Sequence, residues 1–202
     1  MSKQNIVIVK YNAGNIRSVN NALLRLGNEG VITADPDAIR RADKVIFPGV
    51  GEASNTMKYL NETGLGNLIK ELKQPVLGIC LGMQLMGSHS EEGDVDCLGI
   101  FNEPVCKFQL PEPNPDNLKI PQMGWNRIYD LKSDLFDPSL EGEYVYFVHS
   151  YYVAKGIDTA STTDYIIPYS SALQRDNYFA TQFHPEKSGK VGEKILMNFL
   201  KL

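Results

Sequence analysis

The sequence predicts an α/β fold in three layers, with a mostly parallel central sheet, flanking helices and a smaller antiparallel portion. In the first half of the chain, short apolar runs alternate with segments of helical periodicity, which implies parallel strands joined by helical crossovers. From about Leu98 onward the segments are shorter and strand-like, and turns that contain Pro and Asn join them.

Three strands of the parallel portion are expected within the first 80 residues. The run 6–9 is unbroken and β-branched, which is typical of a strand that is covered on both faces, and the mainly apolar runs 44–47 and 75–79 predict two further buried strands. Pro48-Gly49 is expected to stop the second of these strands, because proline cannot donate a ladder hydrogen bond.

A helix is expected after each of these strands. The first helix carries an apolar side and can close at Gly27; that side is formed by Ile16, Val19, Leu23 and Leu26. Residues 57–72 have a helical pattern after the second strand. A further helix over residues 81–88 follows the third strand without a loop.

The second half is expected to continue as shorter strands and one last helix. Strand-like segments cover residues 104–108, 125–129, 144–148 and 172–175. LPEPNPDNLKIP (110–121) predicts a surface loop and not a domain linker, because strand-like chain resumes directly after it. Residues 189–202 predict a helix that docks on the sheet. No internal repeat or low-complexity tract divides the chain, so we expect one domain over residues 1–202.

Composition and charge set bounds on the class of protein. The chain has 202 residues, 43% hydrophobic and 22% charged, and its net charge of −4 gives no electrostatic reason to expect nucleic acid or an anionic membrane as partner. No run approaches the ~20 apolar residues of a membrane span. Three cysteines without CxxC spacing argue against a disulfide framework and against zinc, so we expect a cytoplasmic protein with no metal and no cofactor.

The stretch GICLG (78–82) places Cys80 between two glycines where the third strand meets the next helix. This pattern is typical of a nucleophile elbow, a strained turn whose crowding excludes a Cβ two residues before and after the nucleophile. The positive end of the helix dipole would lower the thiol pKa there. The N–H of Leu81 is a candidate donor to an oxyanion. The alternative is a packed structural cysteine in a tight turn.

His184 is the candidate base for Cys80. In TQFHPEKSG it follows an apolar, strand-like segment, and Glu186 lies two residues on, where a carboxylate can orient the ring and stabilise imidazolium. Many loops contain such a pair, so the hypothesis depends on its joint occurrence with the elbow. His89, near the end of the elbow helix, is interpreted as a surface residue.

The loop FPGVGEAS (47–54) follows the second strand and is rich in glycine. Its bare backbone can approach a ligand closely, and an amide near Gly51 is a candidate for the second oxyanion donor. A phosphate-binding loop is disfavoured, because the Lys-Ser/Thr of a P-loop and the third glycine of G-x-G-x-x-G are both absent.

GICLGMQLM, PGVG and FHPEKSG resemble the motifs of the class I (triad) glutamine amidotransferases. Within that group, YNAGNIRSV near the start, PQMGWN (121–126) and YFVHSYYV (146–153) resemble the glutaminase subunits of imidazole glycerol phosphate synthases. The resemblance covers essentially the whole chain.

The resemblance implies a glutaminase that works through a cysteine thioester. Cys80 would be the nucleophile, His184 the general base and acid, and Glu186 the residue that orients it. The PGVG loop would change orientation to complete the oxyanion hole. The substrate glutamine would be held by Gln84, His149, Ser150 and Tyr151, although a purely structural role is an equal alternative for His149.

The resemblance also implies a partner, a (β/α)₈-barrel cyclase subunit in a heterodimer. The cyclase would use the ammonia to make imidazole glycerol phosphate and an aminoimidazole carboxamide ribotide (AICAR) in histidine biosynthesis. Candidate residues for the partner interface or ammonia conduit are Asn15, Met123, Trp125, Tyr146 and Lys187. A core position for the single tryptophan and a solvated lysine are the alternatives.

Three other functions stay open from the sequence. A paralogue of the same glutaminase could serve another synthase, such as an amino-sugar or vitamin pathway enzyme. A catalytically silent module is disfavoured by the intact set of Cys80, His184 and Glu186. A cysteine hydrolase that acts on peptides is disfavoured by Gln84 and FVHSY.

Overall fold

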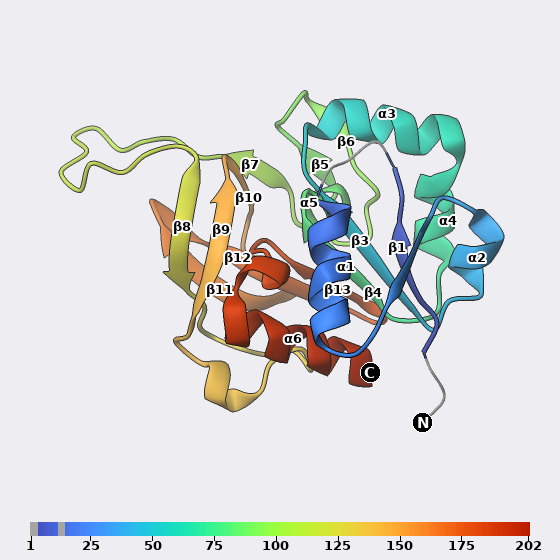
Figure 1. Ribbon diagram of the computed structural model, residues 1–202. Helices are drawn as coiled ribbons and strands as arrows, with labels where there is room; N and C mark the ends of the chain where they lie inside the picture. Colours follow the sequence, from blue (N-terminus) through green and yellow to red (C-terminus); the bar gives the residue numbers. More distant parts are fainter. Residues whose placement is uncertain (1–3, 12–14) are drawn as a thin grey trace.

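A computed structural model describes residues 4–11 and 15–202, and Figure 1 shows helices arranged around a central sheet. Within these residues, eleven strands form that sheet in the order β2-β1-β3-β4-β13-β12-β10-β7-β5-β6, with β11 paired to β12. The strands span Ile6–Val9 (β1), Gly30–Thr33 (β2), Lys44–Gly49 (β3), Val76–Cys80 (β4), His89–Ser90 (β5), Val95–Asp96 (β6), Val105–Lys107 (β7), Tyr151–Val153 (β10), Thr159–Tyr165 (β11), Ile167–Arg175 (β12) and Tyr178–Thr181 (β13).

The sheet has a parallel block and an antiparallel extension. Strands β2, β1, β3, β4 and β13 pair in parallel. Beyond β13 the pairs with β12, β11, β10 and β7 are antiparallel. This is the arrangement that the alternating first half and the strand-rich second half predict, and the α/β fold class is confirmed.

Helices cover both faces of the parallel block. They span Ile16–Arg25 (α1), Pro36–Arg40 (α2), Ala53–Thr63 (α3), Leu65–Glu71 (α4), Leu81–Leu85 (α5) and Gly189–Lys201 (α6), with 3-10 turns at Pro138–Leu140 and Pro185–Lys187. Alternate residues of β1 enter two different cores. Ile6 and Ile8 pack with α1 and α6, whereas Val7 and Val9 pack with α2, α3 and α4. Burial on both faces explains why these strands are unbroken apolar runs.

Three expected boundaries in the first half are wrong. The expected helix 57–72 is two helices, because Gly64 adopts a left-handed conformation (φ 73°) between α3 and α4. Strand β3 does not stop at Pro48-Gly49 but includes both residues, with Gly49 opposite Cys80 of β4. The elbow helix is also shorter than expected, since α5 ends at Leu85.

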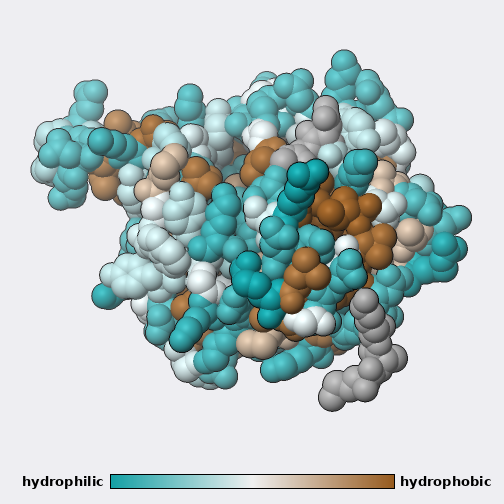
Figure 2. All heavy atoms as spheres, in the orientation of Figure 1, coloured by the Kyte–Doolittle hydropathy of each residue, from teal (hydrophilic) through white to brown (hydrophobic). Residues whose placement is uncertain are grey.

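Strand β2 and helix α2 are absent from the sequence-based expectation. β2 is a four-residue strand at the edge of the sheet, and Val31 and Ile32 on it are exposed, so it lacks a fully buried pattern. Helix α2 has only five residues, capped by the Asp35 side chain with Pro36 at its first position. Figure 2 shows apolar surface to the right of α1, in the part of the molecule where β2 forms the edge.

A two-stranded ribbon stands apart from the sheet. Among the described strands, β8 (Gln122–Arg127) and β9 (Tyr144–His149) pair only with each other, at the left of Figure 1. Strand β8 begins three residues before the expected position. Residues 109–121 form the irregular arm that leads into β8 and extends beyond it, as predicted for a surface loop. No helix in the described ranges is long and apolar enough to cross a membrane.

Candidate active site

Cys80 occupies the strained turn that the elbow pattern predicts. It is the last residue of β4 and has φ 54° and ψ −110°, a conformation that L-residues rarely adopt. A Cβ at Gly82 would overlap the backbone carbonyl oxygen of Phe47 on β3, and a Cβ at Gly78 would lie 2.9 Å from the Met86 sulfur. The steric explanation for the two glycines is therefore confirmed.

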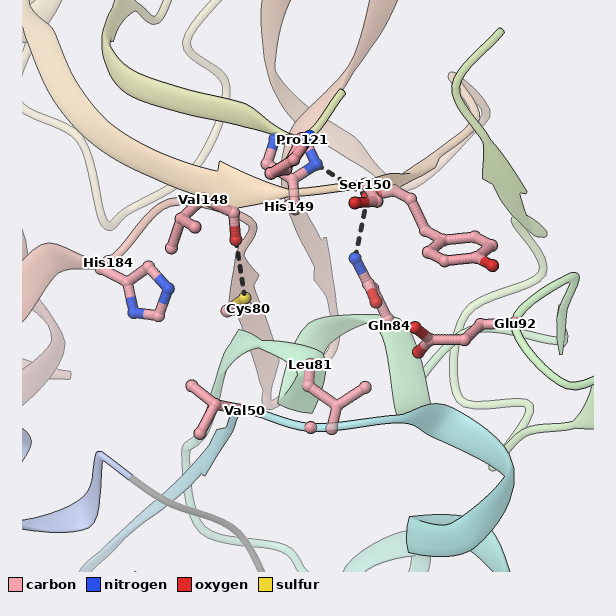
Figure 3. A pocket seen from close by; sticks show the side chains of 12 residues that line it. Val50, Cys80, Leu81, Gln84, Glu92, Pro121, Val148, His149, Ser150 and His184 are labelled. Carbon is pink, nitrogen blue, oxygen red and sulfur yellow. Dashed lines mark hydrogen bonds between the residues drawn. The ribbon is translucent and has the colours of Figure 1, made fainter. Parts of the chain in front are cut away.

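His184 and Glu186 form a buried pair, and the ring of His184 lies next to the sulfur of Cys80. The Nδ1 atom of His184 lies 2.8 Å from Oε1 of Glu186, which fixes the ring tautomer with its Nδ1–H toward the carboxylate. Nε2 of His184 is buried and has no hydrogen-bond partner within the described ranges. Figure 3 shows this ring beside Cys80, so Nε2 is the nitrogen left to exchange a proton with the sulfur or a substrate.

The electrostatics of the pair favour an imidazolium ring. Burial lowers the pKa of His184, but the interactions of the ring with Cys80 and with Glu186 more than offset this effect and raise the pKa to about 10. A protonated His184 next to the sulfur stabilises the thiolate form of Cys80.

The Asn15 side chain contacts both His184 and Glu186, so Asn15 is part of the active site. Its side-chain amide donates a hydrogen bond to Oε1 of Glu186 and lies 3.5 Å from Nδ1 of His184. The sequence suggests Asn15 as an interface or conduit residue. The structure places it where it also holds the orienting carboxylate in position.

A pocket of about 320 Å³ opens in front of the sulfur. Figure 3 shows Cys80 between His184 on one side and Gln84 and Glu92 on the other. The pocket collects the residues that the sequence suggests for substrate and oxyanion, namely Gly51, Leu81, Gln84, His149, Ser150 and Tyr151, together with Cys80 and His184. Gly51 has φ 131°, which a side chain would oppose.

Gln84 and His149 are both anchored to the backbone of Tyr151. Nε2 of Gln84 donates to the Tyr151 carbonyl at 2.9 Å, and Nδ1 of His149 lies 2.7 Å from the same oxygen. Burial lowers the pKa of His149 to about 4 in spite of that hydrogen bond, so the ring is neutral. Tyr169 completes its surroundings, 3.3 Å from Nε2. The structure thus gives His149 structural contacts as well as a place in the pocket wall.

Several pocket residues are missed by the sequence argument. Glu92 lines the pocket, and its Oε2 accepts the backbone N–H of Ala53 at 2.8 Å, at the start of α3. Burial raises the pKa of Glu92, and the nearby Glu52 adds to the effect. The loop sequence SEEGD carries no signal that singles this residue out. Further wall residues are Val50, Pro121 and Val148.

The remaining interface candidates gather on the β8–β9 ribbon. Met123 and Trp125 are 66% and 56% exposed on one face of β8. Trp125 is opposite Tyr146 in register, with ring centroids 6.1 Å apart, and Nζ of the exposed Lys187 lies 5.9 Å from the centroid of the Tyr146 ring. A core position for the single tryptophan is therefore wrong. These four side chains form one surface, called the ribbon face below.

Comparisons with solved structures support the same fold. A putative GMP synthase protein from Thermoplasma acidophilum superposes with a TM-score of 0.74 at 20% identity, over 100% of this chain and 94% of that one. PurLQS from Thermotoga maritima gives a TM-score of 0.71 at 17% identity, over 98% of each chain.

Comparisons of sequence are more specific. The glutamine amidotransferase class-I family model matches residues 8–202. The imidazole glycerol phosphate synthase subunit HisH of Bacteroides fragilis is 60% identical over 98% of this chain and 99% of its own length. The imidazole glycerol phosphate synthase subunit HisH of Escherichia coli K12 is 44% identical over 98% of this chain and 100% of its own length. The chain belongs to the class-I glutamine amidotransferases and, within them, to the HisH subunits of imidazole glycerol phosphate synthase.

Proposed function

We propose that Cys80 of this glutamine amidotransferase hydrolyses glutamine and that the released ammonia passes to a cyclase subunit bound on the ribbon face. The observation that carries the proposal is the pocket itself. It joins a sulfur on a strained elbow, a ring nitrogen of His184 to which none of the described residues is hydrogen-bonded, and a carboxylate at the opposite end, Glu92. The relatives favour imidazole glycerol phosphate synthesis over an amino-sugar synthase as the reaction served.

The first half of the reaction uses the elbow. The thiolate of Cys80 attacks the side-chain amide carbon of glutamine, and the oxygen of that amide becomes an oxyanion. The N–H of Leu81, at the start of α5, and an amide near Gly51 are the donors that we assign to it. His184 gives its Nε2 proton to the leaving ammonia, and a thioester to Cys80 remains.

The second half returns the enzyme to its starting state. Neutral His184 takes a proton from water, the hydroxide adds to the thioester, and glutamate leaves as the Cys80 sulfur is expelled. Glu186 keeps the ring oriented and stabilises imidazolium in both halves, which is the role of the acid in a triad. Asn15 donates to the same carboxylate oxygen that faces His184.

The far end of the pocket suits the α-amino acid portion of glutamine. Glu92 supplies a negative charge for the substrate ammonium group. Both hydrogens of the Gln84 amide are used within the protein, toward Tyr151 and Gln182, so its Oε1 remains as an acceptor. Ser150 and Tyr151 line the same end of the pocket, and we assign them to binding of the α-carboxylate of glutamine.

The ribbon face is the surface that we assign to the partner. Ammonia that escaped into water would be protonated and lose its nucleophilicity, so the partner must bind close to the sulfur. Strand β9 meets this condition, because the carbonyl oxygen of Val148 lies 3.9 Å from Sγ of Cys80 and the backbone N–H of His184 donates to Tyr146. Exposed aromatic side chains such as Trp125 are enriched at protein interfaces. We also propose that residues 1–202 act as one domain and that the complex works in the cytoplasm.

The test is the synthase reaction of a Cys80→Ala variant in complex with its barrel cyclase. Glutamine hydrolysis is expected to fall by about 10⁴-fold or more, as for removal of a triad nucleophile. Synthesis driven by added ammonia is expected to persist, because the cyclase chemistry lies in the partner. Cys97→Ala is the matched control and retains both activities. Loss of both activities in Cys80→Ala would contradict the division of labour, and retained glutamine hydrolysis would exclude Cys80 as the nucleophile.

A further inference from the structure

Gln182 lies beneath the nucleophile and is not part of the pocket wall. It follows β13, two residues before His184, and its side chain is fully buried. Its Nε2 donates to Sγ of Cys80 at 3.8 Å, within the range of hydrogen bonds to sulfur. Gln182 therefore reaches the reacting atom from the protein side, where the substrate does not compete for it.

The orientation of the Gln182 amide is fixed by a chain of hydrogen bonds. The Tyr151 carbonyl accepts one hydrogen of Gln84 Nε2, and the other hydrogen is donated to Oε1 of Gln182 at 2.9 Å. Oε1 of Gln182 is thus committed as the acceptor. Its NH₂ group must then point toward the sulfur, because a flipped amide would place two donors against each other.

One backbone group and one side-chain amide contact the sulfur, and they favour opposite protonation states of it. The Val148 carbonyl, 3.9 Å away, can accept a hydrogen bond from the neutral thiol and repels a thiolate. The Gln182 amide can only donate, so it favours the thiolate. The site therefore contains a neutral donor that acts on the sulfur in addition to the charge of His184.

We infer that Gln182 is a further residue of the nucleophile's site: held in orientation by Gln84, its amide donates to the Cys80 sulfur, positions it and stabilises the thiolate. The inference rests on the proposed function of Cys80. It also links the two ends of the pocket, because Gln84 contacts both the substrate-binding strand at Tyr151 and the residue that holds the sulfur.

The experiment measures the rate of Cys80 alkylation by iodoacetamide as a function of pH, by mass spectrometry of the Cys80 peptide. Gln182→Met keeps the size of the side chain and removes the donor. The midpoint of its pH profile is expected to rise by about half a pH unit to one unit, the range of a weak charge-assisted hydrogen bond. Gln182→Glu is nearly isosteric but places a carboxylate against the sulfur, so a larger rise is expected. Gln109→Met, at an exposed position, is the matched control and leaves the midpoint unchanged.

The other titratable groups at the site are unchanged in every variant, and only Gln182→Glu adds one; they are His184, Glu186, His149, Tyr11, Tyr151 and Glu92. A midpoint that is lowest in the wild type and highest in Gln182→Glu supports the inference. Folded variants with wild-type midpoints would overturn it, even if their turnover or thermal stability were reduced, because a merely structural role changes only those. If Gln182→Met does not fold, Gln182→Leu, which also lacks the donor and carries no charge, takes its place. Failure of the wild type to hydrolyse glutamine would instead refute the proposed function.

Discussion

At the scale of single residues, the three cysteines differ in their surroundings. Cys80 has an imidazolium neighbour in His184 and an amide donor in Gln182. Burial raises the pKa of Cys97 to about 12, with a further rise from the charge of Asp96. Burial also raises the pKa of Cys106. Near neutral pH, Cys97 and Cys106 are thus thiols with little thiolate to react.

The first prediction is selective labelling of Cys80. A glutamine analogue that bears a diazo ketone is expected to modify Cys80 and to leave Cys97 and Cys106 free at pH 7, which peptide mass spectrometry measures. Excess glutamine is expected to slow the labelling, because it occupies the same pocket. Equal labelling of all three thiols would contradict the activation of Cys80 by its neighbours.

The second prediction concerns the charge at the far end of the pocket. Glu92→Gln keeps the side-chain size and an acceptor for the Ala53 N–H, but removes the negative charge that faces the substrate ammonium. The KM for glutamine is expected to rise about 10- to 100-fold, as for a lost hydrogen bond to a charged group, with a smaller effect on kcat. Glu91→Gln is the neighbouring control, since Glu91 does not line the pocket. A KM unchanged by Glu92→Gln would place the ammonium elsewhere.

The sequence predicts those site residues that a local pattern in the sequence marks. Cys80 is marked by two glycines that the turn requires. Glu186 is marked by its spacing from His184. Glu92 and Gln182 have no such mark, because a loop carboxylate and a strand-end amide can face in any direction until the fold is formed. Only the structure shows one in the pocket wall and the other under the sulfur.

At the scale of elements, the elbow depends on the close approach of α5 to β3. A Cβ on Gly82 would overlap the Phe47 carbonyl oxygen, which is fixed in the sheet. Gly82→Ala therefore must displace either α5 or β3. Because Gly49 of β3 lies opposite Cys80 in register, a shift of either element also moves the sulfur relative to the PGVG loop.

The third prediction follows from this contact. Gly82→Ala is expected to destabilise the fold by about 3 kcal/mol, the upper end of the range for overpacking, and to reduce glutaminase activity. Chemical denaturation measures the first effect. The control is Gly66→Ala in α4, where a Cβ would lie 3.2 Å from the flexible end of Leu98 and where alanine is the better helix former. The control is expected to stay within about 1 kcal/mol of the wild type. Equal stability of both variants would contradict the crowding of the elbow.

The sequence predicts well the elements that have a buried apolar pattern, and it predicts poorly those that lack one or whose pattern hides a break. The strand Ile6–Val9 is apolar throughout because it is buried on both faces, and the helices α1 and α6 each bury one apolar side, so all three have clear patterns. The break at Gly64 is hidden, because the apolar side continues from Leu60 to Leu68 across it and both sides of the break enter the same core. Strand β2 is hidden because it is half-exposed at the edge of the sheet.

At the scale of the whole molecule, strand order brings the site together. Strands β3, β4 and β13 are neighbours and parallel, so their carboxyl ends lie at one edge of the sheet. These ends lead to the PGVG loop, to Cys80 and to His184, residues far apart in the sequence. Parallel strands are predictable from the sequence, but the insertion of β13 next to β4 is not, because it depends on long-range packing. Ligand sites at the carboxyl ends of parallel strands are the general rule for such sheets.

The two buried histidines couple the stability of the molecule to pH with opposite signs. The pKa of His184 in the folded chain, about 10, is above the ordinary value of 6.5, so its contribution is fully present below pH 6.5 and is lost as pH rises toward 10. Burial lowers the pKa of His149 to about 4, so its contribution is present above pH 6.5 and is lost as pH falls toward 4. Between pH 6.5 and 4, only His149 of these two changes the free energy of unfolding.

The last prediction isolates that histidine. His149→Asn keeps an N–H for the Tyr151 carbonyl but cannot titrate. At pH 7 the wild type is expected to be the more stable protein, and its advantage is expected to shrink by about 1.4 kcal/mol per pH unit below 6.5. Urea denaturation at half-unit steps from pH 7 to 4.5 measures the difference. His89→Asn is the control: hydrogen bonds to Asp96 and Asp94 raise the pKa of His89, so that difference is expected to stay flat below pH 6.5. A constant advantage over His149→Asn would mean that the buried ring accepts a proton as readily as in the unfolded chain, and the pocket wall at Tyr151 would then be solvated.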